Sequence, residues 1–185
     1  MLKRFTEIFM RASSKRRNST AIRFAVILSL LSLNITQAQA ITPILSIDRE
    51  ISYGVVLPEP GSCRMIAKTA VIMDYLGTNI CVMQDDARNG LYIITANPNK
   101  NIRVKVLPNQ DNGDGVVFNP YIEMNSDGET PQTIFNNTGF VLINSGVTGV
   151  VNLYLGGDLV VSRSYPYNQK IIFSFVDAIE WQEDP

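Results

Sequence analysis

Apolar and polar residues alternate along much of the chain beyond residue 40. Residues 102–106 (IRVKV) and 151–155 (VNLYL) place an apolar side chain at every second position. Successive side chains of an extended strand point to opposite faces, so this alternation predicts strands with one buried and one exposed face. No stretch of useful length has the spacing of an amphipathic helix.

Short apolar runs separated by clusters of Gly, Asn, Asp and Pro complete the pattern of an all-β chain. The expected strands are residues 51–57, 65–73, 80–83, 91–96, 102–106, 116–124, 139–143, 151–155, 159–161 and 170–176. These ten segments approach the strand number of a two-sheet β-sandwich. Gly156 and Gly157, followed by Asp158, are expected to reverse the chain in a tight hairpin, because glycine tolerates the positive φ angles of such turns. The expected loops are residues 58–62, 84–90, 108–115, 125–131 and 163–169.

Residues 1–40 have the pattern of an export signal. This segment contains seven Lys and Arg residues and an apolar run at residues 24–33, and Ala38 and Ala40 supply the small side chains of a cleavage site. Cleavage after Ala40 starts the mature protein at Ile41. The alternative is an uncleaved membrane anchor, but the apolar run is well short of the roughly 20 residues that a helix needs to span a bilayer. Met1 and Met10 are both candidate start residues, and neither changes the mature chain.

Cleavage leaves a single domain at residues 41–185, a size that can bury a sizeable core. The leader carries seven of the 16 basic and one of the 17 acidic side chains, so the domain carries nine and 16, a net charge of −7. An acidic surface repels phosphate groups, so no nucleic-acid partner is expected, and no stable membrane insertion is expected after cleavage. The acidic tail at residues 182–185 is expected to fray.

Cys63 and Cys81 are the two cysteines of the chain. An even pair in an exported protein is expected to form a disulfide, because the periplasm and the cell exterior are oxidising. Closing a loop of this length removes unfolded-state entropy equivalent to about 3 kcal/mol. Zinc binding is the weaker alternative, since two thiolates without any histidine fall short of the usual ligand number.

The chain contains no histidine, which removes Ser-His-Asp and Cys-His catalysis together with the commonest metal ligand. The adjacent carboxylates Asp85 and Asp86 would point to opposite sides of an extended chain, and we expect them to be solvated in a turn. We therefore expect no enzyme activity and no cofactor.

Two loops hold the remaining candidate ligands. Residues 109–115 (NQDNGDG) cluster short oxygen donors, which makes Asp111 and Asp114 the candidate cation ligands. The closing glutamate of a calcium loop is missing, so a plain glycine-rich turn is favoured and no metal site is predicted. Tyr165 and Tyr167 place two rings on one loop, which suits stacking on a sugar or a peptide. Packing of such a loop against the domain is the commoner use of these rings.

Four short motifs follow one another along the chain: ISYGV at residues 51–55, GLYI at 90–93 with NPNKNIRV at 97–104, YLGGDLVV at 154–161 and IIFSF at 171–175. In this order they resemble a family of bacterial exported immunoglobulin-like domains, the domain of unknown function 4402. The resemblance spans roughly residues 46–176. The chain departs from the family pattern at residues 165–169, where the family has a turn rich in glycine and tyrosine.

The resemblance implies an immunoglobulin-like sandwich and a pilin-like or fimbrial subunit in the periplasm, at the cell surface or in the medium. Its expected partners are like subunits or a periplasmic chaperone, bound through strand addition, with residues 41–48 as the extended donor strand. An ordinary first strand of a self-contained domain is the alternative for that segment. The alternative function is a monomeric exported binding module that presents residues 108–115 and 163–169 to a glycan, a peptide or a cation.

Overall fold

The computed structural model describes residues 41–110, 115–136, 138–166 and 178–184, apart from the side chains of Met83, Asn109 and Gln110. All of them belong to one compact unit, Ala40–Pro185. The described residues form thirteen strands and no helix, so the all-β prediction is confirmed. Within this part of the chain no helix is long and apolar enough to span a bilayer.

The strands are β1 (Ile44–Arg49), β2 (Ser52–Val55), β3 (Gly61–Met65), β4 (Ile72–Asp74), β5 (Met83–Arg88), β6 (Gly90–Thr95), β7 (Asn101–Val106), β8 (Asn109–Gln110), β9 (Val116–Ser126), β10 (Gln132–Phe135), β11 (Val141–Asn144), β12 (Val150–Val161) and β13 (Ile179–Glu183).

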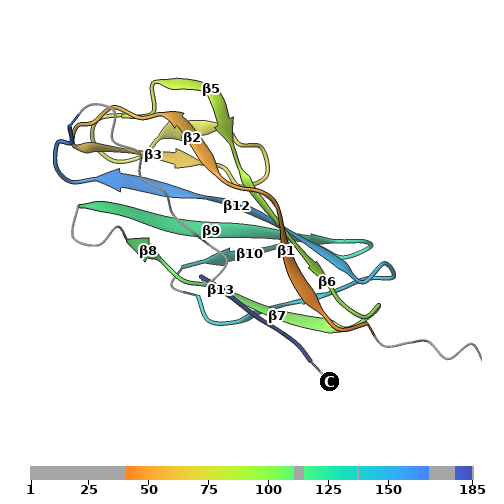
Figure 1. Ribbon diagram of the computed structural model, residues 1–185. Helices are drawn as coiled ribbons and strands as arrows, with labels where there is room; N and C mark the ends of the chain where they lie inside the picture. The colour runs from red at the N-terminus through yellow and green to blue at the C-terminus, as the bar shows by residue number, and fades with distance from the viewer. Residues whose placement is uncertain (1–40, 111–114, 137, 167–177, 185) are drawn as a thin grey trace, which may run out of the picture. The chain divides into compact units, whose positions relative to one another are not determined.

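Strand β12 is the centre of the eight-stranded main sheet (Figure 1). One edge of β12 pairs with β9 from residue 151 to residue 161. The other edge pairs first with β6, over residues 150–155, and then with β3, over residues 157–161. β12 therefore changes its neighbour on one side at Gly156, while β9 follows it without interruption.

Two smaller sheets complete the described fold. β7 lies between β11 and β13 in a three-stranded sheet, and β2 pairs with β5. The three sheets share one apolar core, which contains Val104 of β7, Leu153 of β12 and Tyr53 of β2. Side chains therefore bury the inner face of the main sheet against the smaller sheets.

The alternating segments behave as their pattern predicts. In β7 the side chains of Ile102, Val104 and Val106 are fully buried, while those of Arg103 and Lys105 are half-buried between the sheet and water. Lys105 pairs with Glu180 of β13, which lies next to β7, and Arg103 pairs with Asp184, the residue after β13. The predicted strands at residues 91–96, 102–106 and 116–124 are confirmed.

Several predictions about the ends of strands are wrong. Gly156 and Gly157 lie inside β12 and do not form a hairpin, because β9 pairs with the whole strand. Residues 84–88 belong to strand β5 and not to a loop, because β2 pairs with Ala87 and Arg88 and, after a shift of register, with Met83. Residues 65–73 contain a turn between β3 and β4, and of residues 80–83 only the last lies in a strand.

The two ends of the domain are also better ordered than expected. The tail does not fray after residue 181, since β13 continues to Glu183 and the Asp184 N–H donates to the Asn101 carbonyl over 2.8 Å. Residues 44–49 form strand β1 of this same domain, the ordinary first strand that was the alternative to a free donor. The strand expected at residues 170–176 lies outside the described residues.

Candidate functional site

The most concentrated polar cluster of the domain surrounds the point where β12 changes neighbours. A Cβ atom on Gly156 would lie 2.5 Å from Ala67 N and 2.7 Å from Ala67 Cα, and closer still to the Met65 carbonyl oxygen. The end of β3 and the residues after it therefore cross β12 at backbone contact distance. Only glycine permits this approach. We call the polar residues around the crossing the strand-switch cluster: Arg49, Tyr53, Arg64, Asn89, Tyr121 and Asp158.

Tyr53 anchors the cluster from the side of the core. Its hydroxyl donates to the Gly157 carbonyl over 2.6 Å, and its ring meets the Phe118 ring edge-on with centroids 5.9 Å apart. Burial, together with the nearby Asp158 carboxylate, raises the pKa of Tyr53 well above its usual value. The phenol therefore stays protonated at neutral pH and acts as a buried hydrogen-bond donor.

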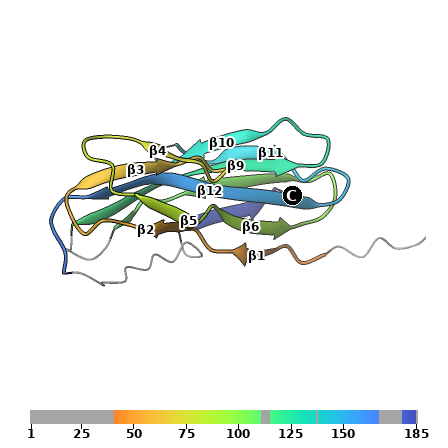
Figure 2. The same cartoon turned by 90° about the horizontal axis from the view of Figure 1, so that it is seen from above.

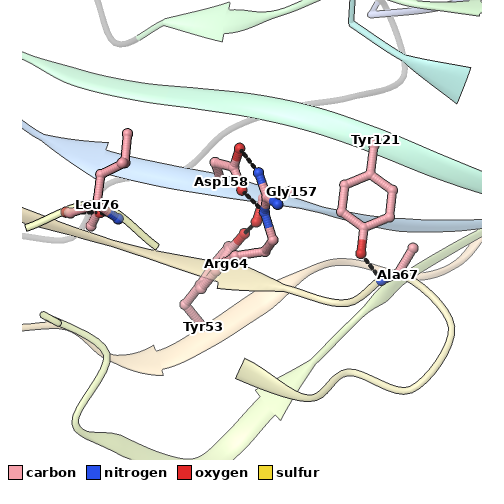
Figure 3. A network of polar contacts seen from close by, with 8 residues as sticks. Tyr53, Arg64, Ala67, Leu76, Tyr121, Gly157 and Asp158 are labelled. Carbon is pink, nitrogen blue, oxygen red and sulfur yellow. Dashed lines mark hydrogen bonds and ion pairs between the residues drawn. The ribbon is translucent and has the colours of Figure 1, made fainter. Parts of the chain in front are cut away.

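Arg64 and Asp158 form an ion pair between directly opposite residues of β3 and β12 (Figure 3). Both Nε and Nη2 of Arg64 donate to the carboxylate, with Nη2 2.8 Å from Oδ2. The guanidinium carbon lies 4.3 Å from the centroid of the Tyr75 ring. This bond to Asp158 raises the pKa of Arg64 above its already high value, so the guanidinium stays charged. The ion pair with Asp158 and the cation–π contact with Tyr75 therefore hold the Arg64 side chain in place.

The Ala67 peptide is held from both sides. Its N–H donates to the Tyr121 hydroxyl over 2.9 Å, as Figure 3 shows, and its carbonyl accepts from Asn89 Nδ2. Arg49 in turn donates from Nε to the Asn89 carbonyl over 2.9 Å and from Nη2 to Asn89 Oδ1 over 2.6 Å. Burial raises the pKa of Tyr121, so its hydroxyl also stays neutral. These bonds fix the segment that crosses Gly156.

The polar side chains of the cluster bond to backbone groups and to one another. The cations of the cluster bond to a carboxylate or an amide, and its two tyrosines have raised pKa values, so it presents no activated nucleophile or general base. Among the described residues no three Cys, Asp or Glu side chains gather closely enough to hold a metal ion. A hollow of about 360 Å³ lies elsewhere in the described part of the chain, and Glu129 is the one ionisable residue of its lining.

The predicted disulfide is confirmed. Cys63 of β3 is bonded to Cys81, which lies two residues before β5, and both side chains are fully buried. The bond fastens the segment after β4 to the strand that replaces β6 beside β12. A buried disulfide is consistent with an oxidising compartment.

Of the other predicted site residues, the structure describes Tyr165 alone. Tyr165 packs against the core, its N–H donates to the Pro58 carbonyl over 2.9 Å, and the Arg163 guanidinium lies 5.6 Å from its ring. Packing of this loop, the commoner use of its rings, therefore applies to Tyr165. Asp85 and Asp86 are exposed on β5. Tyr167, Asp111 and Asp114 lie outside the described residues.

Strand β1 is a second feature of functional interest. It pairs with β6 on one side, and no described strand pairs with its outer edge, as the view in Figure 2 makes clear. Leu45 packs against the core, whereas the side chains of Ile44 and Ile47 are 55% and 44% exposed. Backbone hydrogen bonds therefore hold β1 in place more than side-chain burial does.

The sequence contains little signal for the strand-switch cluster. Its members come from β1, β2, β3, β9 and β12 and from the residue between β5 and β6, and Asn89 has the local pattern of a turn. The glycine pair was the one detectable sign. Comparison of the chain with protein-family models, with curated proteins and with solved structures found no match.

Proposed function

We propose that this chain is an exported, non-catalytic structural subunit of the pilin-like or fimbrial type, built as an immunoglobulin-like two-sheet sandwich related to the domain of unknown function 4402 family. The leader pattern at residues 1–40 and the buried Cys63–Cys81 bond support export. The shared core between the main sheet and the smaller sheets supports the sandwich.

The observation that carries the proposal is the geometry of β1. This strand begins three residues after the expected mature N-terminus and lies at an edge of the main sheet as described. Leu45 is its one side chain in the core, and it is only partly buried, so it contributes less than the about 1.5–3 kcal/mol of a fully buried side chain. A neighbouring subunit's β1 offers β6 the same backbone bonds and the same leucine. Exchange between subunits therefore costs little at equilibrium, which is the condition for assembly by strand donation.

A non-catalytic role agrees with the side chains present. The chain lacks histidine, and the strand-switch cluster uses its ionisable groups to hold backbone segments. Such a cluster resists deformation, which suits a subunit that transmits force along a surface structure.

A cysteine-mixing experiment tests strand donation. Ser46 of β1 and Ile93 of β6 lie directly opposite each other, and the Ser46 hydroxyl donates to the Ile93 carbonyl over 3.3 Å. Opposite residues of antiparallel strands are close enough for a disulfide. A Ser46→Cys chain and an Ile93→Cys chain, co-expressed with the leader intact, should form a mixed disulfide dimer only when β1 of one chain pairs with β6 of the other.

The matched control combines Ser46→Cys with Thr133→Cys, since Thr133 is exposed on β10 at the far edge of the main sheet. This combination should give no mixed dimer. Equal dimer yields from the two combinations, or monomers alone at the highest concentrations reached, would reject strand donation and leave a self-contained domain.

Phe135 and Tyr121 favour a second candidate function, an exported binding module. Their ring centroids lie 5.9 Å apart on the face of the main sheet opposite the core, and Phe135 is 54% exposed. An exposed ring on a rigid sheet suits stacking against a sugar. Glycan-array binding by the processed monomer that Phe135→Ala abolishes, without loss of thermal stability, would support this function.

A further inference from the structure

The side chain of Asn97 joins the beginning and the end of the domain. Its Oδ1 accepts from the backbone N–H of Ile41 over 2.7 Å, and its Nδ2 donates to the Ile41 carbonyl over 3.1 Å. The same Nδ2 donates to Oε1 of Glu183 over 2.9 Å, and the Asn97 backbone N–H donates to Oε2 over 3.0 Å. Ile41 precedes β1, and Glu183 is the last residue of β13.

This arrangement uses every polar atom of the Asn97 amide. One acceptor and both donor hydrogens face either the first residue of the domain or the Glu183 carboxylate. Ile41 N is therefore separated from a full negative charge by one polarised amide group. Hydrogen bonds in such a chain strengthen each other, and an ionised member strengthens them further.

We propose that Asn97 and Glu183 form a binding site for the α-ammonium group created at Ile41 when the leader is removed. The inference rests on the export and processing proposed above. Hydrolysis of the Ala40–Ile41 peptide bond adds one water, which leaves a carboxylate on Ala40 and an ammonium on Ile41. The backbone nitrogen that already bonds to Asn97 Oδ1 thereby changes from a neutral amide with one hydrogen to a cation with three.

The charges around this position favour the cation. Glu183 and Asp184 approach from β13 and its end, and Arg103 of β7 pairs with Asp184, with Nη2 2.6 Å from Oδ1. Among the described residues no cation forms an ion pair with Glu183, the carboxylate that Asn97 connects to Ile41. The bonds between Asn97 and Glu183 are partly buried, so water screens the attraction between the Glu183 carboxylate and a nearby cation incompletely.

Processing would thus hold β1 more firmly against β6 than in the precursor. β1 is also held by backbone bonds to β6, by Leu45 and by the bonds of Arg49 to Asn89. Strengthening the existing bond at Ile41, three residues before β1, therefore raises the free energy needed to detach the strand. The ammonium site sets how readily the strand leaves its own domain, and thereby regulates the exchange on which assembly depends.

Amide hydrogen exchange of β1 in the processed protein measures this effect. The native form begins at Ile41; a comparison form carries one alanine inserted between Ala40 and Ile41, which displaces the ammonium by one residue. We expect the β1 amides of the native form to exchange about threefold to tenfold more slowly, the gain of one charge-assisted hydrogen bond. Glu183→Gln in both forms should remove the difference.

Glu180→Gln is the matched control, because Glu180 lies on the same strand and pairs with Lys105 instead. It should leave the difference between the two forms intact. Equal exchange in the native and inserted forms, or a difference that survives Glu183→Gln, would overturn the ammonium site while leaving export untouched. An exported protein whose measured mass shows a start other than Ile41 would overturn the site together with the processing step.

Discussion

Replacing Gly156 with alanine tests the account of the strand switch most directly. The new Cβ would lie 2.5 Å from Ala67 N and 2.7 Å from Ala67 Cα, where carbon needs roughly 3.5 Å. The crossing segment must therefore move by about 1 Å. It cannot move freely, because the Ala67 peptide bonds to Tyr121 on one side and to Asn89 on the other.

The expected cost follows from these two effects. Overpacking typically costs about 1–3 kcal/mol, and weakening the two hydrogen bonds of Ala67 adds about 1 kcal/mol. We therefore expect Gly156→Ala to lower the free energy of unfolding by about 3 kcal/mol, and the midpoint of thermal unfolding by roughly 10 °C for a domain of this size. Urea unfolding followed by the fluorescence of Trp181, the single tryptophan, measures the change.

Gly139→Ala is the matched control. A Cβ at Gly139 meets no atom within 4 Å, and its φ lies outside the left-handed region, so its stability should change by less than about 0.5 kcal/mol. A Gly156→Asn variant distinguishes a strand crossing from a turn. In a turn, asparagine should be less destabilising than alanine, whereas in a close crossing its larger side chain should be more destabilising. A Gly156→Ala protein as stable as the Gly139→Ala protein, or rescued by Gly156→Asn, would refute the reasoning.

Three further variants probe the described contacts. Cys63→Ala combined with Cys81→Ala should lower the free energy of unfolding by about 3 kcal/mol, and reductant should have no further effect on the double variant. Tyr53→Phe should cost about 1–2 kcal/mol by leaving the Gly157 carbonyl without its donor. Because the pKa of Tyr53 is raised in the folded state, the phenol contributes its full stability below the unfolded pKa near 10, and this stability is lost as pH rises above that value. Tyr53→Phe should therefore make the free energy of unfolding less sensitive to pH above about 10. The same pH dependence in both proteins would contradict the burial of the phenol. Asp158→Asn should lower the free energy of unfolding, measured with urea, by only about 1 kcal/mol. The effect is small because the Arg64 side chain is 38% exposed, so water replaces part of the lost ion pair.

The described strands show which features local sequence predicts well. β7 alternates apolar and charged residues, and the apolar ones are fully buried, because an extended chain presents every second side chain to the same face whatever lies beside it. β5 shows the opposite case. Its polar residues have the composition of a loop, yet they lie in a strand, because β2 pairs with residues at both ends of β5.

The glycine pair at Gly156 is also compatible with two structures. A glycine pair between two short apolar runs is typical of a hairpin, and the sequence pattern is the same when another strand crosses at that point. The part of β3 that contacts Gly156 lies about ninety positions away along the chain. The residues next to Gly156 in sequence therefore give no sign of this contact. The cluster members Asn89 and Tyr121 were missed for the same reason.

The sequence alone was sufficient to predict the all-β class, the buried faces of its most regular strands and the pairing of its two cysteines. These follow from side-chain periodicity along an extended backbone and from the count of thiols, both of which are properties of the chain itself. The tertiary structure decided that β12 exchanges β6 for β3 at a glycine, that no described strand pairs with the outer edge of β1, and that one asparagine joins Ile41 to the last strand. Each of these depends on hydrogen bonds and close packing between residues far apart in sequence, which exist only once the sheets have assembled.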